Sequence, residues 1–77
     1  MKAYLKRIEI NQKIMVGKPV IKGTRVTVEA ILERLKEGWT VEAILEDFPS
    51  IKKEDVKAAL EYAESLVKGE EFIPAIR

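Results

Sequence analysis

Apolar residues recur at helical spacing through much of the second half of the chain. A stripe at i, i+3, i+4 and i+7 predicts an amphipathic helix over about 28–37. We expect Thr27 to be its N-cap and Gly38 to end it, because glycine adopts left-handed backbone geometry at little cost. The same spacing restarts after Thr40 and predicts a second, shorter helix over about 41–47.

A third apolar stripe predicts the longest helix, over about 53–68. Its members are Val56, Ala59, Leu60, Ala63, Leu66 and Val67. Pro49 separates this helix from the second, and Lys68 with Gly69 closes it. A short helix, a turn and a longer helix, with another helix packed across both, is the plan of a helix-turn-helix domain. The final helix of such a domain can enter the major groove of DNA, although many three-helix bundles bind no DNA.

The residues before the first helix follow a different pattern. Tyr4–Ile10 alternates partly between apolar and polar, and Gly17 and Gly23 bracket a second apolar stretch, Lys18–Lys22. These features predict two short strands or extended segments, which must pack on the helices or on another subunit because an isolated hairpin is marginal. We expect one mainly α domain in three parts. They are a basic β-type arm (1–27), a trihelical core (28–68) and a C-terminal tail (69–77).

The composition excludes several kinds of chemistry. The 77 residues include no cysteine and no histidine, which excludes disulfides, thiolate or imidazole metal sites, and catalysis by either side chain. The carboxylates of Glu46–Asp47 and of Glu54–Asp55 point about 100° apart on a helix, so neither pair converges on one ion. A solvated face or an interaction with the helix dipole is expected instead. We therefore expect a non-enzymatic protein without a cofactor.

Location and assembly follow from the absence of long apolar segments and from the small size. The longest uninterrupted apolar runs are three residues, so we expect a cytoplasmic protein that does not enter a membrane.

Ten lysines and eleven glutamates, with one asparagine and one glutamine, are typical of a thermophile. A helical domain this small without a disulfide or metal often gains stability from a partner chain, which favours a homodimer or higher oligomer.

Charge is distributed unevenly along the chain. Residues 1–27 carry seven bases and one acid, whereas residues 28–77 carry seven bases and twelve acids. This asymmetry favours a basic arm that meets an anionic surface; the alternative is that the two halves neutralise each other, including across a dimer. The third helix is basic only near its start, so the arm is the better candidate for nucleic-acid contact, with a turn of solvated lysines as the plainer alternative. The candidate DNA-binding residues are Lys18, Lys22, Arg25, Lys52, Lys53 and Lys57.

Two sets of apolar side chains lie at the ends of the predicted helices. Trp39, in the turn between the first two helices, is expected to cap the core, with an interface anchor as the alternative. The tail carries Phe72, Ile73 and Ile76. These three either fold back on the core or form a segment that orders on binding a partner protein.

The stretch from Gly17 to Ala63 resembles domain-of-unknown-function family 433. The resemblance rests on Gly-Lys-Pro-Val-Ile-Lys-Gly-Thr-Arg at 17–25, on the stop Asp-Phe-Pro at 47–49, and on the Glu54-Asp55 start of the third helix. It implies a homeodomain-like, trihelical helix-turn-helix fold preceded by a hairpin.

Two places depart from the family pattern. One is the turn after the first strand, where members often carry proline or aspartate and a small residue and this chain has Asn11-Gln12-Lys13-Ile14, which leaves the register of the arm open. The other is Lys52, which stands where members of the family often carry serine or threonine as the N-cap of the third helix. Loss of that cap costs about 1 kcal/mol of helix stability unless Ser50 or a carboxylate replaces it.

The same resemblance implies an antitoxin of a type II toxin–antitoxin pair. Such a protein binds and neutralises a nuclease toxin of the PIN-domain type, and it represses its own operon as a DNA-binding dimer. Two alternatives stay open on the residues alone: a stand-alone helix-turn-helix regulator of transcription, and a structural oligomerisation module in which the arm exchanges strands between subunits.

Overall fold

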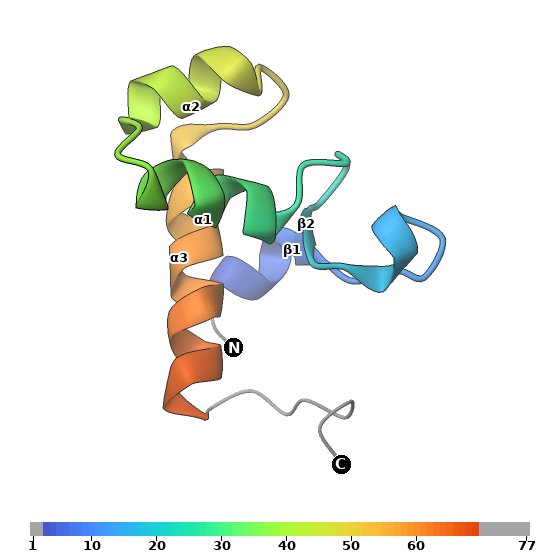
Figure 1. Cartoon of the computed structure of the whole chain (residues 1–77). Coiled ribbons are helices and arrows are strands. Elements are labelled where there is room, and N and C mark those ends of the chain that lie inside the picture. Colours follow the sequence, from blue (N-terminus) through green and yellow to red (C-terminus); the bar gives the residue numbers. More distant parts are fainter. Residues whose placement is uncertain (1–2, 70–77) are drawn as a thin grey trace.

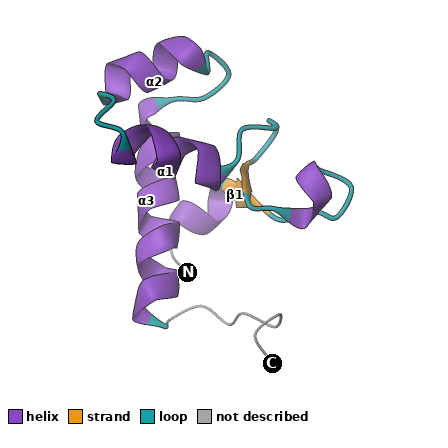
Figure 2. Ribbon diagram, viewed as in Figure 1, coloured by secondary structure: helices purple, strands orange, loops and turns teal. Residues whose placement is uncertain are grey.

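Three helices follow a small hairpin in the computed structural model, which describes residues 3–69 (Figure 1). The element bounds, with η for a 3-10 helix, are η1 (Ala3–Lys6), β1 (Ile8–Glu9), η2 (Met15–Gly17), β2 (Val20–Ile21), α1 (Val28–Lys36), α2 (Val41–Asp47) and α3 (Lys53–Lys68). The predicted mainly α, helix-turn-helix architecture with a preceding β-hairpin is confirmed (Figure 2). No described helix combines the length and the apolar character needed to cross a membrane.

Hydroxyl and glycine residues set the ends of the first two helices. The Oγ1 of Thr27 accepts a hydrogen bond from the Ala30 N–H at 3.0 Å, and the Oγ1 of Thr40 accepts one from the Ala43 N–H at 3.1 Å. Each bond satisfies a donor that the first helical turn leaves unpaired. Gly38, at a φ of 90°, reverses the chain after α1. Both predicted N-caps and this predicted stop are confirmed.

The hairpin is shorter than the sequence pattern indicated. β1 and β2 pair antiparallel over two residues each, with Ile8 opposite Ile21. Residues 4–6, which we expected to belong to the first extended segment, lie in the 3-10 helix η1 instead. This helix packs on α3, where the rings of Tyr4 and Tyr62 meet edge to face at 6.0 Å. An isolated short hairpin is marginally stable, so α3 supplies the support that a longer strand would otherwise need.

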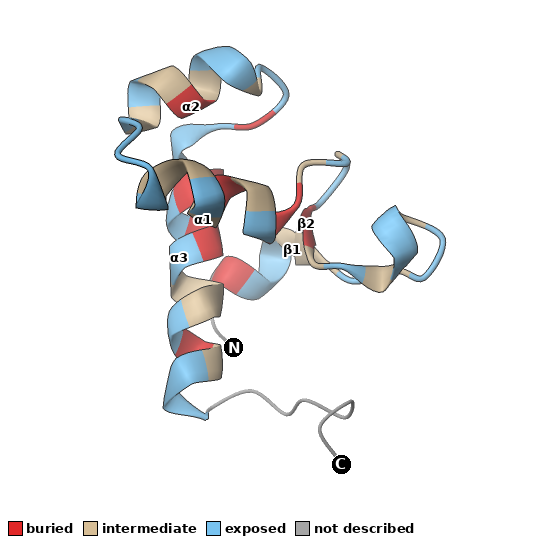
Figure 3. Cartoon of the chain, in the orientation of Figure 1, coloured by how far each residue is buried: buried red, intermediate tan, exposed pale blue. Residues whose placement is uncertain are grey.

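The buried core joins the hairpin to all three helices (Figure 3). Its buried members are Ile21, Val28, Ile31, Ile44, Ile51, Val56 and Ala59. Because β2 and the loop before α3 both contribute to one cluster, the arm is an integral part of the folded unit rather than an appendage.

The buried face of α3 differs from the predicted stripe. Val56 and Ala59 are buried as expected, but Leu60 is 46% exposed and Val67 is 89% exposed. Ala58 and Ser65 are buried in addition. The interior face of α3 is rotated because η1 packs against this helix as well as α1 and α2, a contact that periodicity alone cannot reveal.

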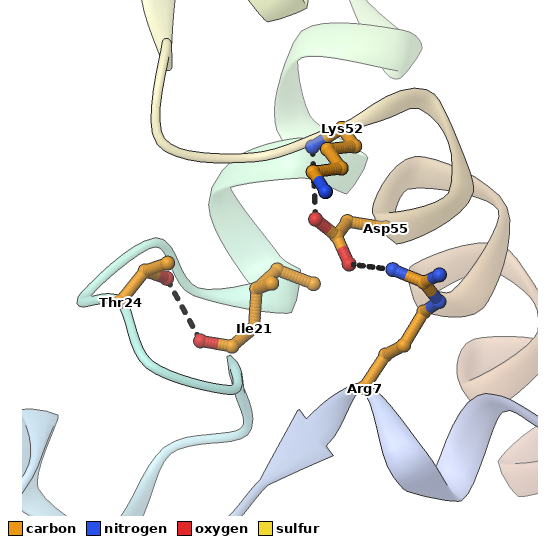
Figure 4. Close-up of polar contacts among 5 residues, drawn as sticks. All are labelled: Arg7, Ile21, Thr24, Lys52 and Asp55. Carbon is orange, nitrogen blue, oxygen red and sulfur yellow. Dashed lines mark hydrogen bonds and ion pairs between the residues drawn. The ribbon is translucent and has the colours of Figure 1, made fainter.

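Asp55 fastens the start of α3 to the arm (Figure 4). Its Oδ2 accepts a hydrogen bond from the backbone N–H of Lys52 at 2.8 Å, and its Oδ1 accepts one from Nη1 of Arg7 at 3.0 Å. Asp55 thus supplies the carboxylate half of a capping box, which satisfies the N–H of the N-cap residue, whereas the side chain of Lys52 makes no cap hydrogen bond. Of the two roles expected for this acid, a solvated face does not apply, because Asp55 is only 6% exposed, whereas its place in the first turn of α3 fits an interaction with the helix dipole.

The turn between α1 and α2 is held by Arg34 rather than by a buried tryptophan. The Arg34 guanidinium lies 5.0 Å from the ring centre of Trp39 and 4.8 Å from that of Phe48. It also donates to Oδ2 of Asp47 at 2.8 Å. Trp39 itself is 37% exposed, so it does not cap the core as expected but packs at the surface against the Arg34 guanidinium.

Candidate nucleic-acid interface

The turn after β2 presents Arg25 to solvent on a defined backbone. The hydroxyl of Thr24 donates to the carbonyl of Ile21 at 2.8 Å (Figure 4). The Thr24 N–H donates to the same carbonyl at 3.0 Å. The Thr24 hydroxyl also accepts from the Val26 N–H at 3.0 Å. Gly23 precedes it at a φ of 81°, with nothing near the position of a Cβ. The turn is therefore fixed by its own side chain, and its outer surface is open.

A surface cavity of about 580 Å³ joins this turn to the approach of α3. Its lining residues are Ile14, Gly23, Thr24, Arg25 and Ser50. Ser50 is followed two and three residues later by Lys52 and Lys53, at the first residues of α3. The fold therefore brings Arg25 of the arm to the same edge of the molecule as the start of the third helix.

The charge of this edge is positive. Within residues 3–69, the side chains of Lys22, Arg25, Lys52 and Lys53 are exposed, and none lies within ion-pair distance of a carboxylate. The nearest buried acid, Asp55, is already neutralised by Arg7. Arg25 lines the cavity, Lys22 precedes its lining residue Gly23, and Lys52 and Lys53 follow its lining residue Ser50; we call these four bases the basic edge. Cations that have no carboxylate partner are the ones available to neutralise phosphates.

Two of the candidate residues from the arm and α3 lie elsewhere. The Nζ of Lys18 forms an ion pair with Oε1 of Glu29 at 3.1 Å, with both side chains largely exposed. Lys57 lines a separate cavity of about 200 Å³, which it shares with Glu54, Glu61 and Arg7. Neither lysine belongs to the basic edge. The candidate partner-binding residues Phe72, Ile73 and Ile76 lie outside the described residues.

The sequence alone did not indicate a functional role for two polar residues of this region, Thr24 and Ser50. Thr24 shapes the turn that presents Arg25, and Ser50 lines the cavity on the α3 side. The only sequence signal for the first was the Gly-Thr-Arg run at 23–25; Ser50 was considered only as a possible helix cap. Their common location depends on the packing of the arm against the loop before α3, which is a tertiary contact.

Comparison with known proteins matches this chain to one family. The family model described as "Protein of unknown function (DUF433)" matches residues 8–63, which covers the hairpin, α1, α2 and most of α3. A DUF433 member protein from Anabaena variabilis, solved by crystallography, superposes with a TM-score of 0.75 and 25% sequence identity. The superposition covers 82% of this chain and 62% of that one.

Two further relatives bear the description uncharacterised. The protein y4eO of Sinorhizobium fredii is 40% identical over 52 residues, which is 68% of this chain. A protein of Archaeoglobus fulgidus is 58% identical over 26 residues, 34% of this chain and 72% of the relative. The chain spans only 24% of the length of the Sinorhizobium protein.

Proposed function

The chain belongs to the DUF433 family, and from this premise we propose that it is the antitoxin of a type II toxin–antitoxin pair. In this proposal it neutralises a PIN-type nuclease in the cytoplasm and represses its own operon by binding DNA. The observation that carries the DNA-binding half is the basic edge, where Arg25 of the arm and the start of α3 lie on one side of a helix-turn-helix domain.

The shape of the domain supports contact with a DNA backbone at this edge. In helix-turn-helix proteins the N-terminal part of the final helix approaches the bases while neighbouring segments hold the phosphates. Here the residues beside that part of α3 are Lys52 and Lys53, and the Arg25 turn lies beyond the cavity. An open glycine at position 23 leaves room for a sugar–phosphate chain to approach the backbone.

The acidity of the rest of α3 sets a limit on this contact. Glu54, Glu61 and Glu64 follow the two lysines along the helix; Glu61 is half-buried, and Glu64 forms an ion pair with Lys68 at 3.3 Å. These carboxylates repel a duplex lying along the whole helix, so the proposed contact involves only its first turn. The expected affinity is therefore modest for one chain and depends strongly on phosphate neutralisation.

Fluorescence anisotropy with the DNA that precedes the gene tests the contact. At about 0.1 M salt, each lost phosphate contact weakens binding by about eightfold. We expect Arg25→Ala and Lys52→Ala each to weaken binding of the full-length chain by about this factor. The matched control is Lys57→Ala, which removes a lysine of α3 that lines a different cavity from Arg25, and it is expected to change the affinity less than twofold. Equal effects of all three variants would contradict the proposal.

The toxin half of the proposal is supported by the family resemblance and by the apolar residues of the tail. Phe72 and Ile73 supply the kind of aliphatic and aromatic anchors that dominate protein interfaces. Co-expression with the product of the adjoining gene is expected to yield a complex, and Phe72→Asp is expected to weaken it at least tenfold. DNA binding without any nuclease partner would instead identify a stand-alone regulator.

A further inference from the structure

An apolar tip and an apolar groove lie side by side on the surface of this chain. The hairpin tip, residues 13–18, protrudes from the helical bundle between β1 and β2 (Figure 1). The groove runs between α1 and α3 and has a volume of about 560 Å³. We propose that the chain forms a two-fold symmetric dimer in which the hairpin tip of each copy occupies the α1–α3 groove of the other. This inference goes beyond the proposed function and does not depend on it.

The hairpin tip exposes apolar side chains on a strained backbone. Val16 is 83% exposed and Met15 is 37% exposed. Both have positive φ values, 57° and 50°, in the left-handed region that β-branched residues seldom occupy. Such a conformation persists only where something compensates its cost. Within the described chain, nothing packs over Val16, so an intermolecular contact is the compensation that the proposal supplies.

The α1–α3 groove offers a surface of matching character. Its floor and walls are formed by Pro19, Val28, Leu32, Tyr62, Ala63 and Leu66. A cavity of this size accommodates two or three aliphatic side chains, and its lining is mainly apolar, as is usual for binding clefts. The side chains of Met15 and Val16 have the size and the chemistry to fill it.

Charge identifies a second copy of the chain as the occupant. Lys13 and Lys18 flank the apolar residues of the tip, and Glu29 and Glu33 stand on the rim of the groove beside Lys36. Lys18 already pairs with Glu29 within one chain, so in the proposed dimer this pair is exchanged between copies and the second tip also meets Glu33. The opposite charges of the tip and of the rim attract each other across the proposed interface, and this complementarity disfavours partners whose charge does not match. The same complementarity appears along the chain as a basic first part and an acidic second part.

The position of the two features suits two-fold symmetry. Pro19 lies in the groove and directly follows the tip, and the ion pair between Lys18 and Glu29 bridges them within one chain. A self-complementary patch needs both halves of the contact close to one axis. Tip and groove meet this condition, so a single axis near Lys18 places each tip in the opposite groove and closes the assembly at two copies.

Substitution of Val16 tests the tip. The experiment is sedimentation of the full-length chain from micromolar to several hundred micromolar concentration, in which we expect a reversible dimer. We expect Val16→Asp to raise the dissociation constant by about a hundredfold or more, because both symmetric contacts lose a buried valine. The same variant is expected to leave the monomer at least as stable as the wild type, since aspartate tolerates a left-handed backbone better than valine does.

A second pair of variants tests the groove and the symmetry. Ala63→Arg places a cation where the basic tip docks, and it is expected to abolish the dimer as Val16→Asp does. A mixture of the two variants is expected to form a heterodimer, because one intact tip then meets one intact groove. Leu60→Glu, on the exposed side of α3 outside the groove, is the control and is expected to leave the dissociation constant within twofold of the wild-type value.

Four results would overturn the proposal. The first is a wild-type chain that stays monomeric at several hundred micromolar, and the second is a dimer that Val16→Asp does not weaken. The third is a mixture of Val16→Asp and Ala63→Arg that does not associate. The fourth is a dimer that is lost with Leu60→Glu but retained with Val16→Asp. The last result would place the contact on the outer face of α3 instead.

Discussion

Replacing Asp55 with alanine removes the contact that fixes the start of α3 against the arm. The carboxylate accepts the Lys52 N–H at 2.8 Å and the Arg7 guanidinium at 3.0 Å. Alanine leaves neither acceptor, while the buried Val56 and Ala59 on the same helix keep their packing. The substitution therefore measures the contribution of these two polar contacts separately from that of the hydrophobic core.

The expected loss of stability can be worked from these contacts. A helix cap is worth roughly 1 kcal/mol, and an acid in the first turn adds about 0.5 kcal/mol through the helix dipole. The ion pair contributes only about 0.5 kcal/mol, since the side chain of Arg7 is 42% exposed and screened by solvent. The better helix propensity of alanine returns about 0.5 kcal/mol. The sum predicts that Asp55→Ala lowers the free energy of unfolding by about 1.5 kcal/mol.

Urea and thermal denaturation followed by circular dichroism measure this loss. For a domain of this size, about 1.5 kcal/mol corresponds to a fall in melting temperature of roughly 6–12 °C. Asp55→Asn keeps an acceptor for the Lys52 N–H but loses the charge, so it is expected to cost about half as much. Arg7→Ala completes a double-mutant cycle with an expected coupling of about 0.5 kcal/mol. A change below about 0.5 kcal/mol for Asp55→Ala would refute the assignment of Asp55 as the cap.

Three further substitutions test other local contacts by the same denaturation measurements. Arg34→Ala removes the cation between Trp39 and Phe48 and is expected to cost about 1–2 kcal/mol; an unchanged midpoint would show that the stacking contributes nothing. Gly38→Ala forces a Cβ onto a φ of 90° and is expected to cost about 1 kcal/mol, and a neutral result would contradict the left-handed helix end. Val16→Asn, measured in dilute solution, is expected to raise stability by about 0.5–1 kcal/mol because asparagine accepts left-handed geometry, whereas a loss would argue against strain at this position.

The helices were predictable because local rules alone decide where they begin and end. Hydroxyl residues at positions 27 and 40 and a glycine at 38 act through neighbouring backbone groups, so the bounds of α1 and α2 agree with the predicted ones within one residue. The third helix was also placed correctly, at Lys53–Lys68. Its buried face was not, because η1 docks on α3 from the distant end of the chain and determines which side is interior.

The candidate interface could be predicted only in part for the same reason. Charge along the chain identified the right kind of residue in the arm and at the start of α3. It could not separate Arg25, which faces the cavity beside Ser50, from Lys18, which pairs with Glu29. Nor could it indicate that Lys57 lines a different cavity. Such distinctions depend on which surfaces the folded arm brings together, and no local pattern encodes them.

The salt dependence of DNA binding tests the proposed role of the basic edge most directly. If the four bases of the edge each neutralise one phosphate, the logarithm of the binding constant falls with the logarithm of salt concentration at a slope of about −3.6 per chain. The double variant Arg25→Ala/Lys52→Ala is expected to reduce this slope to about −1.8. A slope unchanged by the double variant, or no binding at low salt, would contradict the assignment of this edge to DNA.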